Sequence, residues 1–226
     1  MAQKTELLPC VEIEPKTRAT HAIVWLHGLG ADGHDFVPIV PHLQLDPKIP
    51  VRFVFPHAPK IPVAVNMGMV MPAWYDIYGA DLRQGQDEAG IRRSAAQVQA
   101  LVEREMERGV PSRNIVLAGF SQGGAMAVHV ALRHVQPLAG MLALSTYLVL
   151  GETIDAEISS ANRGIATFQA HGTQDPLVLF RRGEELHRRL VDIGCDVTWR
   201  TYPMQHEVCM EEIADAGAWL RERLRN

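Results

Sequence analysis

Short apolar runs alternate along the chain with longer segments in which apolar residues recur every three or four positions. The runs that are nearly continuous in apolar residues predict strands over 21–26, 51–55, 114–120, 138–144, 165–170 and 196–202. Residues 11–14 alternate between apolar and charged side chains, which predicts an edge strand with one solvated face. Continuous apolar strands are typical of parallel sheets that are covered by helices on both faces.

The longer segments predict helices. Apolar stripes favour helices over 87–108, from 179 to 193 and from about 207 to 224, and the small apolar residues of 121–135 predict a buried helix. Gly109 and Pro111 end the first of these helices, because glycine permits a left-handed cap and proline lacks an N–H. Strand and helix alternate to the end without an internal repeat or linker. We therefore expect a single α/β domain over residues 1–226 with a mostly parallel sheet.

Residues 56–86 break this rhythm with several prolines and with Met67, Met69 and Met71. A loop of this length inside a compact domain is usually functional or mobile. Two interpretations stay open. The apolar side chains, among them Met67, Met69 and Trp74, line a substrate groove, or they pack on the edge of the sheet as an extra strand or two.

Composition and charge exclude several classes of protein. The 226 residues are 47% hydrophobic and 21% charged, with a formal charge of −4 and no basic stripe, which argues against nucleic acid as a partner. The polar N-terminus and the lack of a run of ~18 apolar residues predict a cytoplasmic protein without integral membrane association. Cys10, Cys195 and Cys209 are too few, and not spaced as C-x-x-C, for a disulfide framework or a zinc knuckle.

A G-x-S-x-G motif carries the candidate chemistry. It spans Gly119–Gly123 and lies where a predicted strand ends and a predicted helix begins. In such a motif the serine, here Ser121, occupies a sharp turn, and the flanking glycines let its hydroxyl stand clear of the sheet. The alternative is a tight turn whose serine only caps the helix. The position between strand and helix favours the nucleophile.

A nucleophilic serine needs a histidine base, which follows it along the chain in this kind of fold. Two histidines, His187 and His206, are candidates. His187 falls within an amphipathic helix, where a solvated side chain explains it. His206 follows the strand 196–202 in a loop at the carboxyl edge of the sheet, where open α/β sheets place their sites. We expect His206 to be the base.

The acid that orients the base should lie between the serine and the histidine. Asp175 follows the strand 165–170 in a turn at the same edge, whereas Asp155 lies in a polar excursion and Asp192 near a helix C-terminus. Asp175 is therefore the expected acid, although an Asp-Pro sequence also initiates turns.

Backbone N–H groups complete the predicted site. The N–H of Gln122 is placed by its position after the serine, and that of Leu29 by the glycines that follow the strand 21–26. Together they would form an oxyanion hole.

Other functions fit less well. Residues 28–33 match the dinucleotide fingerprint G-x-G-x-x-G, but prolines 38 and 41 permit only a short helix after it and no acid stands ready for a ribose. A non-catalytic binding protein of the same fold would usually have lost a member of the triad. The histidines are scattered and no H-E-x-x-H or paired-carboxylate spacing occurs, so we expect no metal. His57 and His171 each precede a turn and are expected to be structural. With the dinucleotide fingerprint set aside, we expect no cofactor.

Blocks along nearly the whole chain resemble the acyl-protein thioesterase and bacterial carboxylesterase family, the phospholipase/carboxylesterase branch of the α/β-hydrolases. They are residues 27–33, 55–59, 73–77, 119–124, 171–176 and 204–208, in family order. The resemblance implies an α/β-hydrolase fold, and the chain is too short to add a large lid domain.

The resemblance also implies the residue roles: Ser121 as nucleophile, Asp175 as acid, His206 as base, and Leu29 with Gln122 as oxyanion donors. The implied activity is hydrolysis of carboxylic esters, thioesters or lysophospholipids, on a small-molecule or acylated-protein substrate, and relatives can be homodimers. Gln205 and Thr146 stand where glycines are common in the family. Both substitutions bear on substrate preference, and neither removes a catalytic group.

Overall fold

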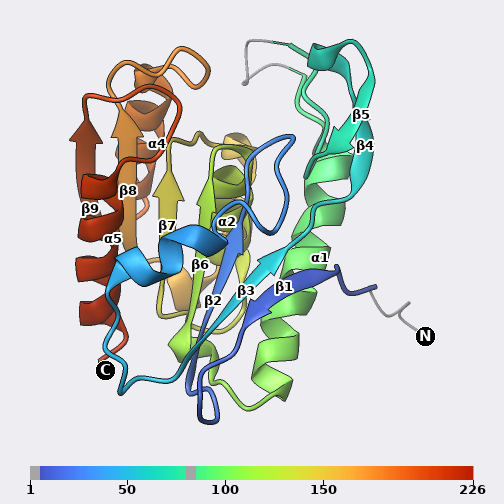
Figure 1. Cartoon of the computed structure of the whole chain (residues 1–226). Helices are drawn as coiled ribbons and strands as arrows, with labels where there is room; N and C mark the ends of the chain where they lie inside the picture. Colours follow the sequence, from blue (N-terminus) through green and yellow to red (C-terminus); the bar gives the residue numbers. More distant parts are fainter. Residues whose placement is uncertain (1–5, 80–84, 226) are drawn as a thin grey trace.

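A seven-stranded sheet forms the centre of the computed structural model, which describes residues 6–79 and 85–225 (Figure 1). The strand order is β1-β3-β2-β6-β7-β8-β9, with β1 antiparallel to β3 and every other pair parallel. The strands are β1 (Cys10–Ile13), β2 (His21–Leu26), β3 (Val51–Pro56), β6 (Ile115–Phe120), β7 (Gly140–Leu144), β8 (Ala166–Gly172) and β9 (Asp196–Tyr202). The predicted parallel sheet with an edge strand near the N-terminus is confirmed.

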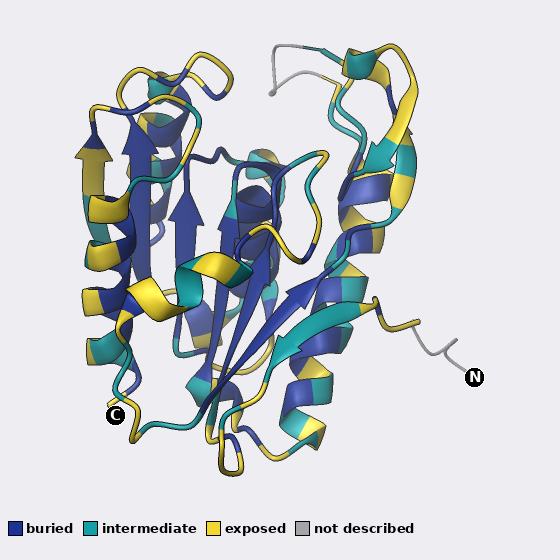
Figure 2. Ribbon diagram, in the orientation of Figure 1, coloured by how far each residue is buried: buried dark blue, intermediate teal, exposed yellow. Residues whose placement is uncertain are grey.

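Helices cover both faces of the sheet, and the central strands are buried throughout (Figure 2). One face packs against α1 (Glu88–Glu107), α2 (Gln122–Arg133) and α4 (Phe180–Asp192), the other against α5 (Met210–Arg223) and the 3-10 helix η1 (Val37–Leu43). Short elements fill the connections: α3 (Ile154–Glu157), η2 (Ala64–Asn66), η3 (Ser112–Asn114), η4 (Gly151–Thr153) and η5 (Ser160–Asn162). Among the described residues, no helix combines the length and the apolar character needed to cross a bilayer.

The segment that breaks the sequence rhythm contains a β-hairpin outside the main sheet. Strands β4 (Lys60–Val63) and β5 (Met69–Pro72) pair antiparallel, and the chain reverses between them at Met67 and Gly68, both with positive φ. Extra strands are therefore present in residues 56–86, but they form a separate two-stranded sheet and do not extend the edge of the main sheet as one interpretation expected. In Figure 1 the hairpin lies at the upper right, beyond the carboxyl end of β3.

Helix α5 begins later than its apolar stripe predicts, at Met210 instead of about residue 207. Cys209 is the reason: its backbone is extended and its sulfur accepts a hydrogen bond from the N–H of Glu212. Residues 203–209 are thereby left as a loop after β9, and this loop carries His206.

A buried ion-pair network fastens the edge strand to helix α1. Glu105 of α1 is fully buried and receives Arg52 of β3 at 2.7 Å and Arg108 at 3.0 Å. Arg108 in turn reaches Glu12 of β1 at 2.8 Å. The network joins three elements that the sequence pattern assigns separately.

A second buried acid, Glu212 in the first turn of α5, has no such partner. Neither carboxyl oxygen has a hydrogen-bond partner among the described residues, and burial raises its pKa to about 8. In the unfolded chain the same group ionises near its ordinary pKa of 4.5. At neutral pH the folded chain therefore holds a proton on Glu212 that the unfolded chain does not. The contribution of Glu212 to the free energy of unfolding thus becomes less favourable as the pH rises from about 4.5 to about 8.

Replacing Glu212 with glutamine is expected to flatten this dependence. The stability of Glu212→Gln relative to the native chain should rise between pH 5 and pH 8, by at most about 1.4 kcal/mol per pH unit. Urea unfolding at both pH values measures the difference. Glu211→Gln, at an exposed neighbouring position, is the matched control. Parallel pH profiles for Glu212→Gln and the native chain would contradict a neutral buried carboxyl.

Candidate active site

The turn between β6 and α2 holds Ser121 in a strained backbone conformation, with φ 54° and ψ −122°. Glycines make this turn possible. A Cβ on Gly119 would lie 2.3 Å from the Gly123 carbonyl oxygen, and one on Gly123 would lie 2.4 Å from that of His27. The motif therefore needs glycine at both positions for steric reasons, and the strained serine is the kind of outlier found at functional sites.

Three side chains from separate loops meet at Ser121. Nε2 of His206 lies 2.9 Å from the Ser121 hydroxyl oxygen, and Nδ1 of His206 lies 2.7 Å from Oδ2 of Asp175. The loops follow β6, β8 and β9, so the meeting point is the carboxyl edge of the parallel strands. The Phe120 ring contacts the imidazole of His206 at a centroid distance of 4.7 Å. The arrangement can take a proton from the serine hydroxyl and stabilise the imidazolium that results.

The surroundings of Asp175 keep it ionised. Its burial alone would raise its pKa, but hydrogen bonds from His206 and from the N–H groups of Val178 and Leu177 outweigh burial and lower the pKa below its ordinary value. His171 lies beside the same carboxylate at 3.6 Å, and its Nε2 is 2.8 Å from the Val178 carbonyl oxygen. His171 thus packs against the turn that holds the acid, in line with a structural role.

Two backbone N–H groups near Ser121, those of Leu29 and Gln122, are the predicted oxyanion donors. Among the described residues, no acceptor engages the N–H of Leu29 or of Gln122. Gly30, with φ +79°, bends the loop after β2 and donates its own N–H to the Pro72 carbonyl at 2.8 Å. Leu29 and Gln122 both line the cavity above Ser121. The oxyanion hole stays a prediction, for which both N–H groups are available.

A set of buried hydrogen bonds beside the loop after β2 was not predicted from the sequence. The Gln122 side chain accepts the N–H of Trp74 at 2.9 Å and donates to the Tyr75 carbonyl at 2.8 Å. The Trp74 indole donates to the His27 carbonyl at 2.9 Å. These bonds tie the start of α2, the strand end of β2 and residues 74–75 together. The contacts join residues nearly fifty positions apart, and no periodic signal in the sequence indicates them.

A cavity of about 500 Å³ opens over the serine. Its walls include Val65, Ile77, Pro176 and Leu177, beside Phe120 and Tyr147. The structure does not bring the three expected substrate-binding residues into this lining. Trp74 is buried and bonded to the end of β2 at His27, while Met67 and Met69 are 95% and 60% exposed on the hairpin.

The residues that depart from the family pattern lie close to the site. The Thr146 hydroxyl donates to the Ser121 carbonyl at 2.6 Å, and its Cβ leaves room only for glycine at position 124. Gln205 is exposed next to His206. His187, the rejected alternative base, lies on α4 and stacks on Trp199 with a centroid distance of 5.3 Å.

Comparison with known proteins assigns the family. The profile of the phospholipase/carboxylesterase family matches residues 9–224. The chain is 38% identical to acyl-protein thioesterase 1 of Neurospora crassa, over 96% of this chain and 92% of that protein. It is 39% identical to acyl-protein thioesterase 1 of Gibberella zeae, over 91% of each.

Solved structures agree with the sequence relatives. Arabidopsis thaliana SOBER1 superposes with a TM-score of 0.84 at 28% identity, covering 90% of this chain and 99% of that one. Zea mays acyl-protein thioesterase 2 gives a TM-score of 0.82 at 27% identity, covering 96% and 99%. The chain belongs to the phospholipase/carboxylesterase family and is a hydrolase of the α/β-hydrolase fold.

Proposed function

We propose that Ser121, His206 and Asp175 form a catalytic triad that hydrolyses acyl esters and thioesters through an acyl-enzyme. The Ser121 oxygen attacks the carbonyl carbon while His206 Nε2 takes the hydroxyl proton. The negative charge on the carbonyl oxygen is bound by the N–H groups of Leu29 and Gln122. The tetrahedral intermediate then breaks its bond to the alcohol or thiol, which leaves with the proton held by His206.

Water completes the cycle. His206 removes a proton from a water molecule, which attacks the acyl carbon bound to Ser121. Collapse of the second intermediate releases the carboxylic acid and returns the proton to the serine oxygen. Asp175 stays ionised throughout, holds the imidazole in the tautomer with a proton on Nδ1, and stabilises the imidazolium.

The observation that carries this proposal is the continuous contact from Ser121 through His206 to Asp175. A fluorophosphonate probe tests it, because an activated serine oxygen attacks its phosphorus, displaces fluoride and forms a stable phosphonate ester. Mass spectrometry should find the adduct on the peptide that contains Ser121. Ser145, also at positive φ at the end of the neighbouring strand, should stay unlabelled. Labelling elsewhere, or none, would reject the triad.

Acylated substrates fit the names of the acyl-protein thioesterase relatives, and we propose from the cavity lining that long acyl chains are preferred. The side chains of Val65, Ile77 and Leu177 give the cavity over Ser121 an apolar wall that a long acyl chain could cover. Leu177 is 70% exposed without substrate, so an acyl chain that covers it would gain hydrophobic contact.

Truncating this wall should therefore affect long substrates selectively. Leu177→Ala is expected to lower kcat/KM about fivefold to tenfold for an eight-carbon p-nitrophenyl ester and little for the acetate, since each buried methylene is worth ~0.8 kcal/mol. Met69→Ala and Trp74→Ala in the same assay test the sequence-based assignment of those residues to the groove. Equal losses on both esters would assign Leu177 to packing instead.

A cytoplasmic location and a homodimer stay predictions. Size-exclusion chromatography of the purified protein decides the second.

A further inference from the structure

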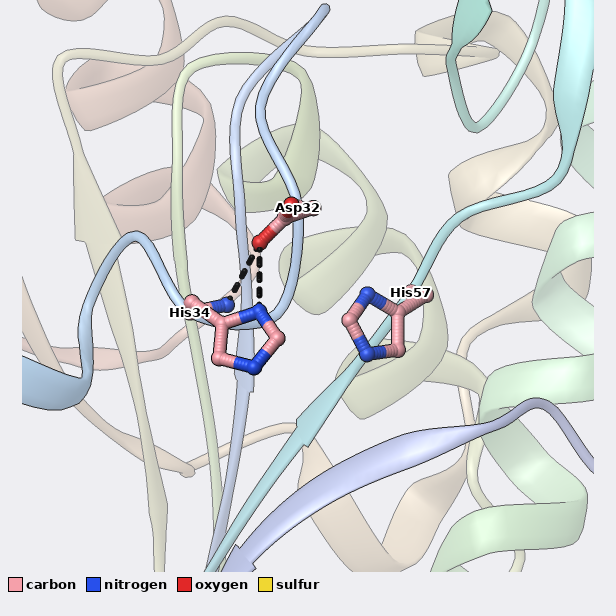
Figure 3. Close-up of side chains that lie close together, drawn as sticks. All are labelled: Asp32, His34 and His57. Carbon is pink, nitrogen blue, oxygen red and sulfur yellow. Dashed lines mark hydrogen bonds and ion pairs between the residues drawn. The ribbon is translucent and has the colours of Figure 1, made fainter.

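Asp32, His34 and His57 form a cluster that the proposed reaction does not use (Figure 3). Each offers one ligand atom, and these atoms lie within 4.8 Å of one another. Asp32 and His34 belong to the loop after β2, whereas His57 follows β3. The scattered positions in the sequence hide this grouping.

Gly33 is the residue that allows the two segments to meet. A Cβ at this position would lie 2.4 Å from the Phe55 carbonyl oxygen and 3.3 Å from the ring of His57. The Gly33 N–H donates to Nδ1 of His57 at 3.2 Å. The absent side chain and this hydrogen bond hold the rings of His34 and His57 at a centroid distance of 5.4 Å.

The Asp32–His34 pair is organised before any ligand arrives. Oδ1 of Asp32 accepts the backbone N–H of His34 at 2.7 Å and lies 3.0 Å from Nδ1 of its ring. In a tetrahedral zinc site with bonds of about 2.0–2.1 Å, neighbouring ligand atoms are about 3.3 Å apart. The pair is therefore at the required spacing. His34 and Asp32 are exposed, so their side chains can rotate to close the remaining distance to His57.

We propose that Asp32, His34 and His57 bind a divalent transition-metal ion of the zinc type. Two imidazoles and one carboxylate suit such an ion better than calcium or magnesium, which prefer oxygen ligands alone. Water would fill the remaining coordination position, because the cluster faces solvent. Ligation requires unprotonated nitrogen atoms, so binding weakens as the pH falls.

Metal binding would reach the oxyanion loop. His57 can bind the metal through Nδ1 or through Nε2, and both cases break the hydrogen bond from the Gly33 N–H. If Nδ1 binds the metal, it can no longer accept this bond. If Nε2 binds the metal, the ring proton moves to Nδ1, which then cannot accept it either. The loop released in this way runs back from Gly33 to Leu29. Ala31 and Asp35, on either side of the cluster's first residues, line the cavity over Ser121. The bound ion is thus a candidate modulator of turnover and takes no part in the chemistry.

Cobalt(II) is the probe for this site, because its visible absorption reports the ligands directly. Titration of the purified native chain is expected to show a single ion per chain with imidazole-type coordination. His34→Gln, His57→Gln and Asp32→Asn should each weaken binding at least about tenfold. His42→Gln, at an exposed histidine of η1, is the control and should leave the affinity unchanged.

A second measurement separates ligation from misfolding. Zinc should raise the melting temperature of the native chain and of His42→Gln, and should not raise that of the three ligand variants, whose melting without metal stays close to native. Absence of cobalt binding by the native chain, or equal affinity in His34→Gln and His57→Gln, would overturn the proposal.

Discussion

Replacing Ser121 with alanine should lower kcat by roughly 10⁴-fold to 10⁶-fold, since removal of the nucleophile from a serine triad leaves only binding and oxyanion stabilisation. The fold should persist. Alanine removes one oxygen and leaves the Ser121 N–H bond to the Leu144 carbonyl intact. Initial rates with p-nitrophenyl butyrate measure the loss, and thermal melting measures the stability.

Ser145→Ala is the matched control for this variant. Ser145 is fully buried, has φ 43° and follows the strand next to β6, yet its hydroxyl has no partner among the described residues. Because this hydroxyl makes no hydrogen bond and is outside the proposed triad, its removal should change kcat less than about threefold, or about 0.7 kcal/mol. Substantial turnover by Ser121→Ala with an intact fold would assign the nucleophile to another residue.

Replacing Glu105 with alanine is the variant with the largest expected cost in stability, about 3–5 kcal/mol. The substitution leaves the guanidinium of Arg52, whose side chain is only 9% exposed, with the half-exposed Glu14 at 2.8 Å as its one remaining carboxylate partner among the described residues. Removing one partner of a buried ion pair costs this much because the other charge stays desolvated. Arg104 and Arg108 lose the same carboxylate at 3.0 Å.

Urea unfolding measures the effect, and two variants interpret it. Glu103→Ala, at an exposed position on the same helix, should cost less than about 0.5 kcal/mol. Replacing Arg52 and Glu105 together with methionine should recover most of the loss, because no unpaired charge is then buried. A Glu105→Ala protein as stable as the Glu103→Ala control would show that Arg52 remains solvated.

The sheet and the contact of Ser121 with His206 and Asp175 could be predicted because they depend on patterns within short stretches of sequence. Apolar runs predict the strands. Glycine is required at positions 119 and 123 because a Cβ there would lie 2.4 Å or less from a backbone oxygen. The meeting of Ser121, Asp175 and His206 then follows from their places after three parallel strands, β6, β8 and β9, whose carboxyl ends share one edge of the sheet. Each of these requirements is visible in a few consecutive residues.

The rest depends on how distant segments pass one another. Trp74 is apolar and aromatic, which favours a groove as much as a core. Only its hydrogen bonds to Gln122 and His27 show that it joins the start of α2 to the end of β2. The meeting of His57 with Asp32 rests on the close approach at Gly33. The residues that make these contacts lie 24 to 48 positions apart, so no local pattern in the sequence indicates that they meet.

The position of β9 has a consequence for how the protein loses activity. In the described sheet β9 lies at the edge and pairs with β8, and the loop that carries His206 follows it. Transient detachment of β9 and α5 would withdraw the base while leaving Ser121 in its turn. Such partial opening requires less free energy than global unfolding. Mild denaturant would then abolish activity through local unfolding of β9 and α5, at a concentration below the one that unfolds the whole domain.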